Sequence, residues 1–277
     1  MEKLAILLTT YNSTRYLEEL LQSIQEQTFK EWKLFIRDDM STDNTLDILT
    51  RYASEDARIQ IIPDDKKRGA KDGFMWLLAN TNAEYYMFCD HDDIWAPDKI
   101  SYSLEQMEAQ TDSDNKPVIV CCDLTVIDGQ GKVISDSFFR FRHYDKSLFN
   151  DKYFHLVYNC IPGCTMLLNS TAKVLAFPYS EEIRMHDSWL AISTLWNGGR
   201  IEVIDKQLIS YRIHDSNTIG AAAVPSFLQQ SCRFRTLLAK TRKQYLCSKG
   251  LHNLSYTQFI CVKLWYMFRI HLSHLFH

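Results

Sequence analysis

The sequence predicts an α/β fold built around a mostly parallel, doubly wound sheet. Two observations predict it: four hydrophobic runs alternate with segments of helical spacing through the first half of the chain, and three of those runs end in polar side chains. Strands that alternate with helices form parallel sheets, which bind ligands at the carboxyl ends of their strands. With 277 residues, 46% of them hydrophobic and 23% charged, the chain has the composition of an ordered globular protein with a substantial core.

Each of the four strand–helix units has its own signal. The opening letters MEKLAILLTT fit a buried first strand better than a secretion signal, because the apolar stretch is short and no small-residue cleavage site follows it. Apolar positions at helical spacing mark the helices, and Pro97 suits the first turn of the fourth one. We expect strands at 3–10, 32–39, 58–63 and 84–90, and helices at 14–27, 41–53, about 70–82 and 97–110.

The second half of the chain is less regular. We expect one or two strands around a glycine-containing turn in 117–135, a strand at 163–169, a helix at 186–198, and closing strands at 199–205 and 206–214. No linker rich in Gly, Ser or Pro separates the two halves. We therefore treat 1–220 as one continuous domain and 221–277 as a helical appendage.

Charge is distributed unevenly along the chain. No acid follows Asp215, whereas 221–277 holds eight Lys and Arg residues, so the rest must carry −11 to give the formal net charge of −3. The aromatic-rich end of this tail is interrupted by Lys263 and Arg269, and it falls short of the ~20 largely apolar residues of a membrane-spanning helix. A helical pair that packs on the body and a helix that lies on an anionic membrane surface are equally good interpretations, ahead of a nucleic-acid patch.

The eight cysteines lie mostly inside apolar runs, and no CxxC pair occurs. This pattern indicates reduced core thiols rather than a disulfide framework or a zinc site. We expect a cytoplasmic protein, peripheral on the inner face of the cytoplasmic membrane if the tail binds lipid.

Polar side chains gather where three of the predicted strands end. They are Thr9, Thr10, Tyr11 and Asn12 for the first strand, Asp38 and Asp39 for the second, and Asp90, Asp92 and Asp93 for the fourth. Because the carboxyl ends of parallel strands meet at one edge, we expect these side chains to form one ligand site. The chain has neither a GxGxxG loop nor a Walker lysine loop, which argues against dinucleotide oxidoreductases and P-loop NTPases.

The acids of CDHDDIW, residues 89–95, would repel one another without a cation among them. Mg²⁺ or Mn²⁺ prefers oxygen ligands and commonly binds one or two carboxylates together with substrate phosphates. We expect such an ion to join the Asp90–Asp92 pair to a diphosphate. For Asp93, a solvated turn or a helix cap is an equal alternative.

Seven motifs now occur in a recognisable order: TTYN, RDDMSTDNT, RGAKDGF, CDHDDIW, GCTMLL, HDSW and YRIHDSN. Together, over residues 4–219, they resemble the GT-A-fold, family 2 inverting glycosyltransferases, and among them the rhamnosyltransferase-like branch that builds bacterial surface polysaccharides. The resemblance implies a Rossmann-like nucleotide-sugar-binding half, about 1–110, fused to an acceptor half, about 111–220, in one continuous mixed sheet. The QxxRW signature of processive relatives is absent, which favours the addition of one sugar per encounter.

The resemblance also implies roles for the residues that bind the donor. DHD resembles the DxD motif of the family, so Asp90 should face the ribose or the diphosphate and Asp92 should bind the metal. His214 matches a histidine that some relatives use as an additional metal ligand. Asp39 matches the acid that accepts the N3–H of uracil or thymine, a proton that cytosine lacks. Thr9 and Tyr11 match the positions that flank this base.

Three further donor assignments are less direct. Asn12 suits a donor contact or a helix cap equally well. Relatives carry an asparagine-rich pattern where this chain has KKRGAKDGF. We therefore expect Arg68 or Lys71 to contact the diphosphate in place of those asparagines.

Asp187 matches the catalytic base of the family, which takes the proton from the acceptor hydroxyl as that oxygen attacks the anomeric carbon. From spacing alone, an N-cap of the following helix would be as good an interpretation. His186 stands where many relatives carry Glu, and we place it at the acceptor. Gly163 and Cys164 match a strand start that lines the acceptor pocket, although core packing is an equal alternative for both.

The sequence thus predicts a metal-dependent inverting glycosyltransferase that uses Mg²⁺ or Mn²⁺. Its donor would be a UDP- or dTDP-sugar and its acceptor a saccharide, lipid-linked in view of the basic aromatic tail, with no nucleic acid bound. A sugar-phosphate nucleotidylyltransferase is the second hypothesis, but LTTYNSTRY lacks the glycines of the phosphate loop that such enzymes carry. A non-catalytic nucleotide-sugar-binding protein is the third, and the presence of both Asp92 and Asp187 argues against it.

Overall fold

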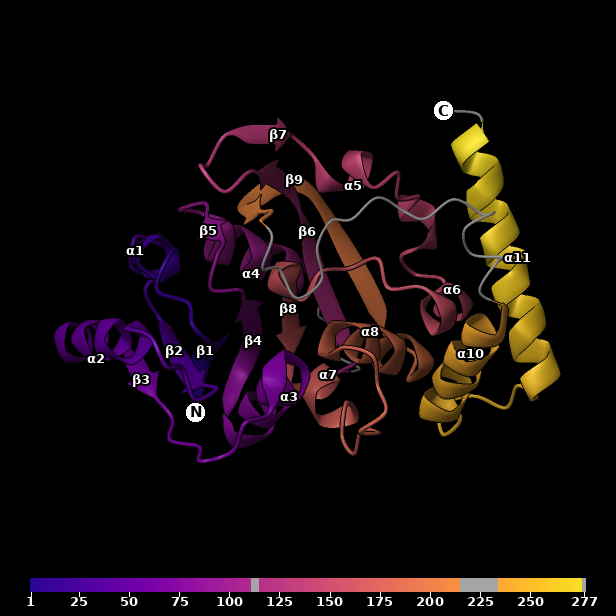
Figure 1. Ribbon diagram of the computed structural model, residues 1–277, viewed down its shortest axis with the longest axis horizontal. Helices are drawn as coiled ribbons and strands as arrows, with labels where there is room; N and C mark the ends of the chain where they lie inside the picture. Colours follow the sequence, from indigo (N-terminus) through magenta and orange to yellow (C-terminus); the bar gives the residue numbers. More distant parts are fainter. Residues whose placement is uncertain (111–114, 215–233, 276–277) are drawn as a thin grey trace.

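One mixed sheet organises the computed structural model, which describes residues 1–110, 115–214 and 234–275 (Figure 1). Its strands are β1 (Glu2–Thr10), β2 (Trp32–Asp38), β3 (Ile59–Ile61), β4 (Ala83–Cys89), β5 (Ile94–Trp95), β6 (Val118–Ile127), β7 (Val133–Ser135), β8 (Met166–Asn169) and β9 (Arg200–Arg212). They run in the order β3-β2-β1-β4-β8-β6-β9-β5, with β7 paired to β6. The predicted continuous mixed sheet is confirmed.

Helices surround this sheet. They are α1 (Leu17–Gln25), α2 (Thr45–Glu55), α3 (Gly69–Asn80), α4 (Lys99–Gln110), α5 (Phe138–Phe141), α6 (Lys152–Val157), α7 (Ser170–Leu175), α8 (His186–Trp196), α10 (Phe234–Ser248) and α11 (Tyr256–Leu275). Two 3₁₀ turns, Lys146–Leu148 and Gly163–Thr165, complete the ordered elements. The first four strands and helices confirm the predicted alternation; α1, α2 and α4 begin two to four residues later than expected, and α3 begins at Gly69, close to the expected start.

The first half of the sheet is parallel, as predicted. β1 pairs with β2 on one side and with β4 on the other, and β3 extends the sheet beyond β2. The chain therefore moves outward from β1 to β3 and then returns to the opposite side of β1. The carboxyl ends of β1 and β4 flank this reversal, which is where open α/β sheets bind ligands.

The second half of the sheet departs from the expected parallel pattern. β8 runs antiparallel to both β4 and β6, whereas β6 and β9 are parallel. The two closing strands predicted at 199–205 and 206–214 are one strand, β9. Its register against β6 shifts between Cys122 and Asp123, which pair with Ile204 and Gln207. The polar Asp205 and Lys206 between those partners therefore form an irregularity within β9 and not a turn between two strands.

Two further differences concern the acceptor half. The strand predicted at 163–169 begins only at Met166, because Thr165 donates its backbone N–H to the carbonyl of Pro162 and closes a 3₁₀ turn. The short helices α5, α6 and α7 were not predicted, since four to six residues are too few to show helical spacing.

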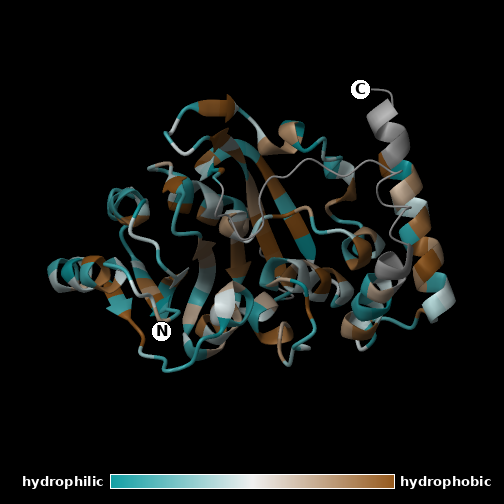
Figure 2. Cartoon of the chain, viewed as in Figure 1, coloured by the Kyte–Doolittle hydropathy of each residue, from teal (hydrophilic) through white to brown (hydrophobic). Residues whose placement is uncertain are grey.

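The core follows the hydrophobic pattern of the sequence. Leu4 to Leu8 in β1 are fully buried because helices cover both faces of a central parallel strand. α1 buries its apolar stripe of Leu17, Leu20, Leu21 and Ile24. Figure 2 shows β6 and β8 as largely hydrophobic, whereas hydrophobic and hydrophilic residues alternate along β9.

The C-terminal appendage is helical in the described part. α11 packs on α6 and α10, where Phe259 and Tyr266 are buried. The expected appendage before residue 234 lies outside the described residues. Among the described helices, none combines the length and the apolar character that crossing a membrane requires.

Candidate active site

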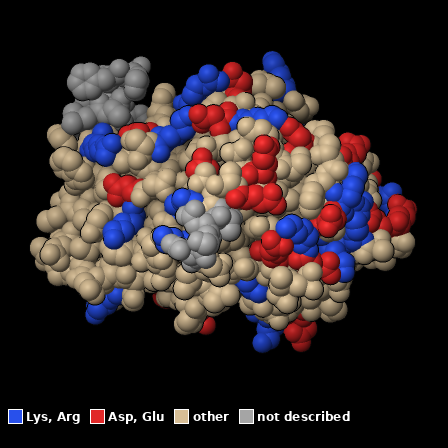
Figure 3. Space-filling view, turned by 180° about the vertical axis from the view of Figure 1, so that it is seen from behind, with Lys and Arg blue, Asp and Glu red and all other residues tan. Residues whose placement is uncertain are grey.

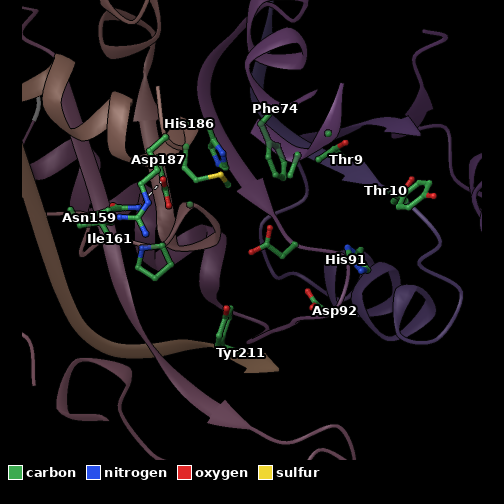
Figure 4. A pocket seen from close by; sticks show the side chains of 18 of the residues that line it. Thr9, Thr10, Phe74, His91, Asp92, Asn159, Ile161, His186, Asp187 and Tyr211 are labelled. Carbon is green, nitrogen blue, oxygen red and sulfur yellow. Dashed lines mark hydrogen bonds between the residues drawn. The ribbon is translucent and has the colours of Figure 1, made fainter. Parts of the chain in front are cut away.

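A cavity of about 710 Å³ lies at the carboxyl ends of β1, β2 and β4 and extends to the N-terminus of α8 (Figure 4). It is lined by nine of the thirteen residues that the sequence predicted for the site: Thr9, Tyr11, Asn12, Asp39, Asp90, Asp92, Gly163, His186 and Asp187. The two halves of the chain thus face one space, with Thr9, Phe74 and Asp92 on one side and Asn159 and Asp187 on the other (Figure 4).

The loop after β1 holds an exposed aromatic ring at the cavity edge. Tyr11 is 44% exposed, and the Lys67 ammonium lies 3.9 Å from the centre of its ring. Asn12 has a left-handed backbone (φ 48°), and its side-chain oxygen accepts a hydrogen bond from the Thr42 N–H at 2.8 Å. It therefore joins two loops and does not cap α1, which begins only at Leu17.

Asp39 lies just beyond β2 and is buried. Its Oδ1 accepts hydrogen bonds from Arg37 Nη2 at 2.6 Å and from the Arg68 N–H at 2.7 Å, and its Oδ2 accepts one from the Gly69 N–H at 3.0 Å. This leaves acceptor capacity on Oδ2, because a carboxylate oxygen has two lone pairs.

The two cations predicted to contact a diphosphate do not line the cavity. Arg68 pairs with Asp64 at 2.6 Å, and Lys71 donates to the Glu181 carbonyl at 2.5 Å. Lys67 lines the cavity instead. The places of Arg68 and Lys71 in the motif predicted one of those two and missed Lys67. Which of these neighbouring side chains faces the cavity depends on the local backbone, which the motif does not reveal.

The acidic turn, residues 90–93, follows β4. Burial and the neighbouring charges of Asp92 and Asp187 raise the pKa of Asp90 to about 7. Asp93 is neither a solvated turn residue nor a helix cap, because its side chain is fully buried and its Oδ1 accepts a hydrogen bond from the Arg212 N–H. The pKa of Asp93 is raised well above its ordinary value. Burial is the largest cause, and repulsion by Asp92 and Asp90 adds to it.

The donor atoms at this turn fit a hard divalent cation. Asp92 Oδ2 and His214 Nε2 lie 2.8 Å apart, so a carboxylate and an imidazole converge beside Asp90. Oxygen ligands supplemented by an imidazole suit Mn²⁺, and oxygen-rich sites suit Mg²⁺. A second group, Asp90, Asp93 and Cys164, has its ligand atoms within 4.8 Å of one another. It fits such an ion less well, since burial keeps Cys164 protonated by raising its thiol pKa.

Asp187 lies in the first turn of α8 but does not cap it, since the N-cap is Met185 and no side-chain cap bond forms. Its Oδ1 accepts hydrogen bonds from Asn159 Nδ2 at 3.0 Å and from the Ser188 N–H at 2.6 Å. These bonds fix the carboxylate at the cavity wall.

His186 is 3% exposed and packs between Phe74 and Phe88, with ring centres 4.4 and 4.9 Å away. Burial lowers the pKa of its imidazole, which favours the neutral ring. Gly163 permits this position, because a Cβ there would lie 2.5 Å from His186 Nε2. Cys164 is buried and does not line the cavity, so core packing describes it better than acceptor contact.

Several residues that line the acceptor side were not predicted. They are Phe138, Arg142, Tyr144, Asn159, Ile161, Arg184 and Tyr211. Asp123 anchors part of this wall, since its side chain accepts hydrogen bonds from the backbone N–H groups of Phe138 and Phe139 and from the Ser137 hydroxyl. Two sequence signals could have indicated this wall: the aromatic residues in 138–144, and Tyr211 as the first residue of YRIHDSN.

Comparison with known proteins agrees with this geometry. The family model for glycosyl transferase family 2 matches residues 5–175, and the chain belongs to this family. It is 26% identical over 227 residues to an uncharacterised glycosyltransferase of Rickettsia typhi, covering 79% of this chain and 66% of that protein. It is 28% identical over 231 residues to the dTDP-rhamnosyl transferase RfbG of Shigella flexneri, covering 77% of this chain and 74% of RfbG.

A third relative matches almost end to end. It is the Escherichia coli protein WfaP, named UDP-Glc:alpha-D-GlcNAc-diphosphoundecaprenol beta-1,3-glucosyltransferase, which is 25% identical over 251 residues, 89% of this chain and 91% of WfaP. By contrast, the chain spans only 41% of the Bacillus subtilis protein TuaG, to which it is 34% identical over 103 residues.

Solved structures confirm the fold class. S. aureus TarS in complex with UDP-GlcNAc superposes with a TM-score of 0.63 at 16% identity, covering 94% of this chain and 70% of that one. The Pyrobaculum calidifontis mannosyltransferase PcManGT, in complex with GDP-Man and Mn²⁺, gives a TM-score of 0.59 at 16% identity, over 92% and 65% of the two chains. The chain therefore has the GT-A fold that the motifs predicted.

The contact between Gly163 and His186 can be tested by stability. We expect Gly163→Ala to lower the free energy of unfolding by about 1–3 kcal/mol, because the added methyl group overpacks the site against the imidazole. In a His186→Ala background the same change should cost much less. Urea denaturation measures both, with Gly250→Ala as control because open space surrounds Gly250. Equal costs in the two backgrounds would contradict the contact.

Proposed function

We propose that this chain is a metal-dependent inverting glycosyltransferase that transfers one sugar from a UDP- or dTDP-sugar to a saccharide acceptor during synthesis of a bacterial surface polysaccharide. One observation carries the proposal: in a family 2 chain, the acidic turn and the Asp187 carboxylate face the same cavity from opposite halves of the sheet. The acidic turn would bind a nucleoside diphosphate through a cation, and the Asp187 carboxylate would act as the base for an acceptor hydroxyl. A nucleotidylyltransferase has no such use for the second carboxylate.

The donor nucleotide would lie at the ends of β1 and β2. Tyr11 offers an exposed ring face against which a base can stack once Lys67 moves aside. Asp39 Oδ2 retains a lone pair for the N3–H of uracil or thymine, and Thr9 lies beside it on the cavity wall. The hydrogen bonds from Arg37 and from two backbone N–H groups hold this carboxylate in one orientation.

Asp92 and His214 would bind Mg²⁺ or Mn²⁺, with Asp90 facing the ribose or the diphosphate. The ion, when bound, offsets the charge of the diphosphate and stabilises the charge that grows on the departing phosphate. Lys67 supplies a further positive charge at the donor side of the cavity.

Asp187 would accept the proton of the acceptor hydroxyl as that oxygen attacks the anomeric carbon. Asn159 donates to Oδ1, which keeps Oδ2 available for the proton. One displacement with the nucleoside diphosphate leaving from the opposite face inverts the anomeric centre, and one base is sufficient for it.

The acceptor would bind the wall opposite the donor. Phe138, Tyr144 and Tyr211 form a cluster there, with Phe138 5.9 Å from Tyr144 and 5.8 Å from Tyr211 between ring centres. Aromatic faces stack readily on sugar rings, and Arg184 adds an exposed cation at the rim. The name of WfaP includes a diphosphoundecaprenol-linked acceptor. This supports the proposal that the acceptor of the present chain is also a lipid-linked saccharide.

Contact with a membrane surface would follow from such an acceptor. α11 presents an exposed apolar face made of Leu264, Trp265 and Phe268, which are 56%, 62% and 57% exposed. Figure 3 shows that charged side chains are sparser on the side of α10 and α11 than on the opposite side of the molecule. α11 packs on the body through one face and exposes an apolar face on the other side, and the proposed lipid contact rests on that exposed face.

Loss of the proposed base should separate binding from transfer. We expect Asp187→Asn to lower the transfer rate by about 10²–10⁴-fold, since general base catalysis contributes that much, while donor affinity is retained. Donor-dependent transfer and titration calorimetry with UDP measure the two effects. A variant that transfers sugar at the wild-type rate would exclude Asp187 as the base.

Removal of the metal should abolish binding of the donor diphosphate. We expect EDTA or Asp92→Asn to eliminate the rise in melting temperature that Mn²⁺ with UDP or dTDP causes, because the acidic turn then repels the phosphates. Addition of excess Mn²⁺ should restore the shift in the wild-type protein only. Full stabilisation by the nucleotide in EDTA would rule out a metal-dependent donor site.

Exposed aromatic residues of α11 should contribute to membrane contact. We expect Trp265→Ser with Phe268→Ser to lower partitioning onto anionic vesicles by about tenfold or more, since burial of one aromatic side chain contributes ~1.5–3 kcal/mol. Vesicle co-sedimentation measures this, with Val133→Ser and Ile134→Ser in β7 as matched exposed controls. Equal partitioning of both double variants would contradict docking through α11.

A further inference from the structure

Arg212 at the end of β9 has one of the largest fully buried side chains of the described chain, although it carries a charge. Its Nε donates to the backbone carbonyl of Asp92 at 2.9 Å, and its own backbone N–H donates to Asp93 Oδ1 at 3.3 Å. Its Nη2 pairs with Glu19 Oε2 of α1 at 2.7 Å. A buried cation is stable only when such partners compensate it, so this side chain is held in one position.

Tyr16 connects the same guanidinium to the predicted metal ligand His214. The Arg212 Cζ lies 4.3 Å from the centre of the Tyr16 ring, and the His214 ring lies 5.2 Å from it. The Tyr16 hydroxyl donates to the Gly129 carbonyl at 3.1 Å, which fixes the tyrosine between the two. Arg212 itself does not line the cavity. It can therefore affect a ligand only through the groups that it holds.

The position of Arg212 answers a specific need of the acidic turn. Three carboxylates within four residues repel one another, and the turn would open unless a positive charge and directed donors held it. Arg212 contacts the turn from outside the cavity, through its Nε bond to the Asp92 carbonyl and its backbone N–H bond to Asp93 Oδ1, whereas Asp92 itself lines the cavity.

We propose that Arg212, itself oriented by Glu19, is a positioning residue that holds Asp92 and His214 in the arrangement that binds the divalent cation. The inference rests on the metal-dependent donor site proposed above and goes beyond it by assigning two residues that do not touch the ligand. Outer partners of metal ligands commonly tune metal affinity in this way.

Two adjacent glutamates on α1 provide a matched test. Glu19 pairs with Arg212 at 2.7 Å, whereas Glu18 pairs with Arg51 at 2.8 Å, away from the turn, and their side chains are similarly exposed at 50% and 44%. We expect Glu19→Ala to weaken Mn²⁺ binding in the presence of UDP by about 3-fold or more, and Glu18→Ala to leave it unchanged. Titration calorimetry of Mn²⁺ at a temperature where each variant is folded measures this.

Substitution of Arg212 should have the larger effect. We expect Arg212→Met to weaken Mn²⁺ binding by about 10–100-fold. Arg212→Lys should give an intermediate affinity, because lysine retains the charge but cannot reproduce both side-chain bonds, to the Asp92 carbonyl and to Glu19. A purely structural role would lower the melting temperature and leave the Mn²⁺ affinity of the folded protein unchanged. If Arg212→Met does not fold, the comparison of Glu19→Ala with Glu18→Ala decides whether the positioning role holds.

The outcomes distinguish this inference from the proposed function. The proposed donor site is supported if the wild-type protein binds Mn²⁺ in the presence of UDP and the Asp92→Asn variant does not. If Glu19→Ala and Arg212→Lys then retain wild-type Mn²⁺ affinity, the positioning role is overturned while the proposed function stands. If the wild-type protein shows no Mn²⁺ binding, both are overturned.

Discussion

Mutual repulsion among the carboxylates that follow β4 is the constraint on which the rest of the site depends. The turn lies at the reversal of strand order, and burial there raises the pKa of both Asp90 and Asp93. Arg212, in the last described strand, donates its backbone N–H to Asp93 Oδ1, which acts against the rise in the pKa of Asp93, and its Nε holds the Asp92 carbonyl. The turn is thus contacted by a residue that lies more than a hundred residues further along the chain.

The continuous sheet also brings both halves of the chain to one cavity. β8 follows β4 in the sheet and runs against it, so the acceptor half begins beside the donor half without a linker. Asp187 contributes to the raised pKa of Asp90, which indicates that the two halves share one electrostatic environment. A cation at the acidic turn would therefore also act on the carboxylate proposed as the base.

The donor loop shows how a family site tolerates change. Two cations of the segment KKRGAKDGF bond to other parts of the protein, since Arg68 pairs with Asp64 and Lys71 bonds to the Glu181 carbonyl. Of the four cations in residues 66–71, Lys67 is the one that lines the cavity. The Arg37–Asp39 pair is buried beneath this loop, so the carboxylate that we propose as the contact to the donor base is held in place without a ligand.

The sequence by itself determined the parallel half of the sheet, the polar strand ends and the acids of the turn, because period-2 and period-3.6 hydrophobic patterns and short motifs are local. It could not determine that β9 is one strand with an irregularity at Asp205 and Lys206, that Asp93 is buried, or which cation of the donor loop faces the cavity. Those outcomes depend on partners distant in the chain, such as Arg212 for Asp93. Only the tertiary structure decided them, because packing brings such partners together and local sequence carries no record of it.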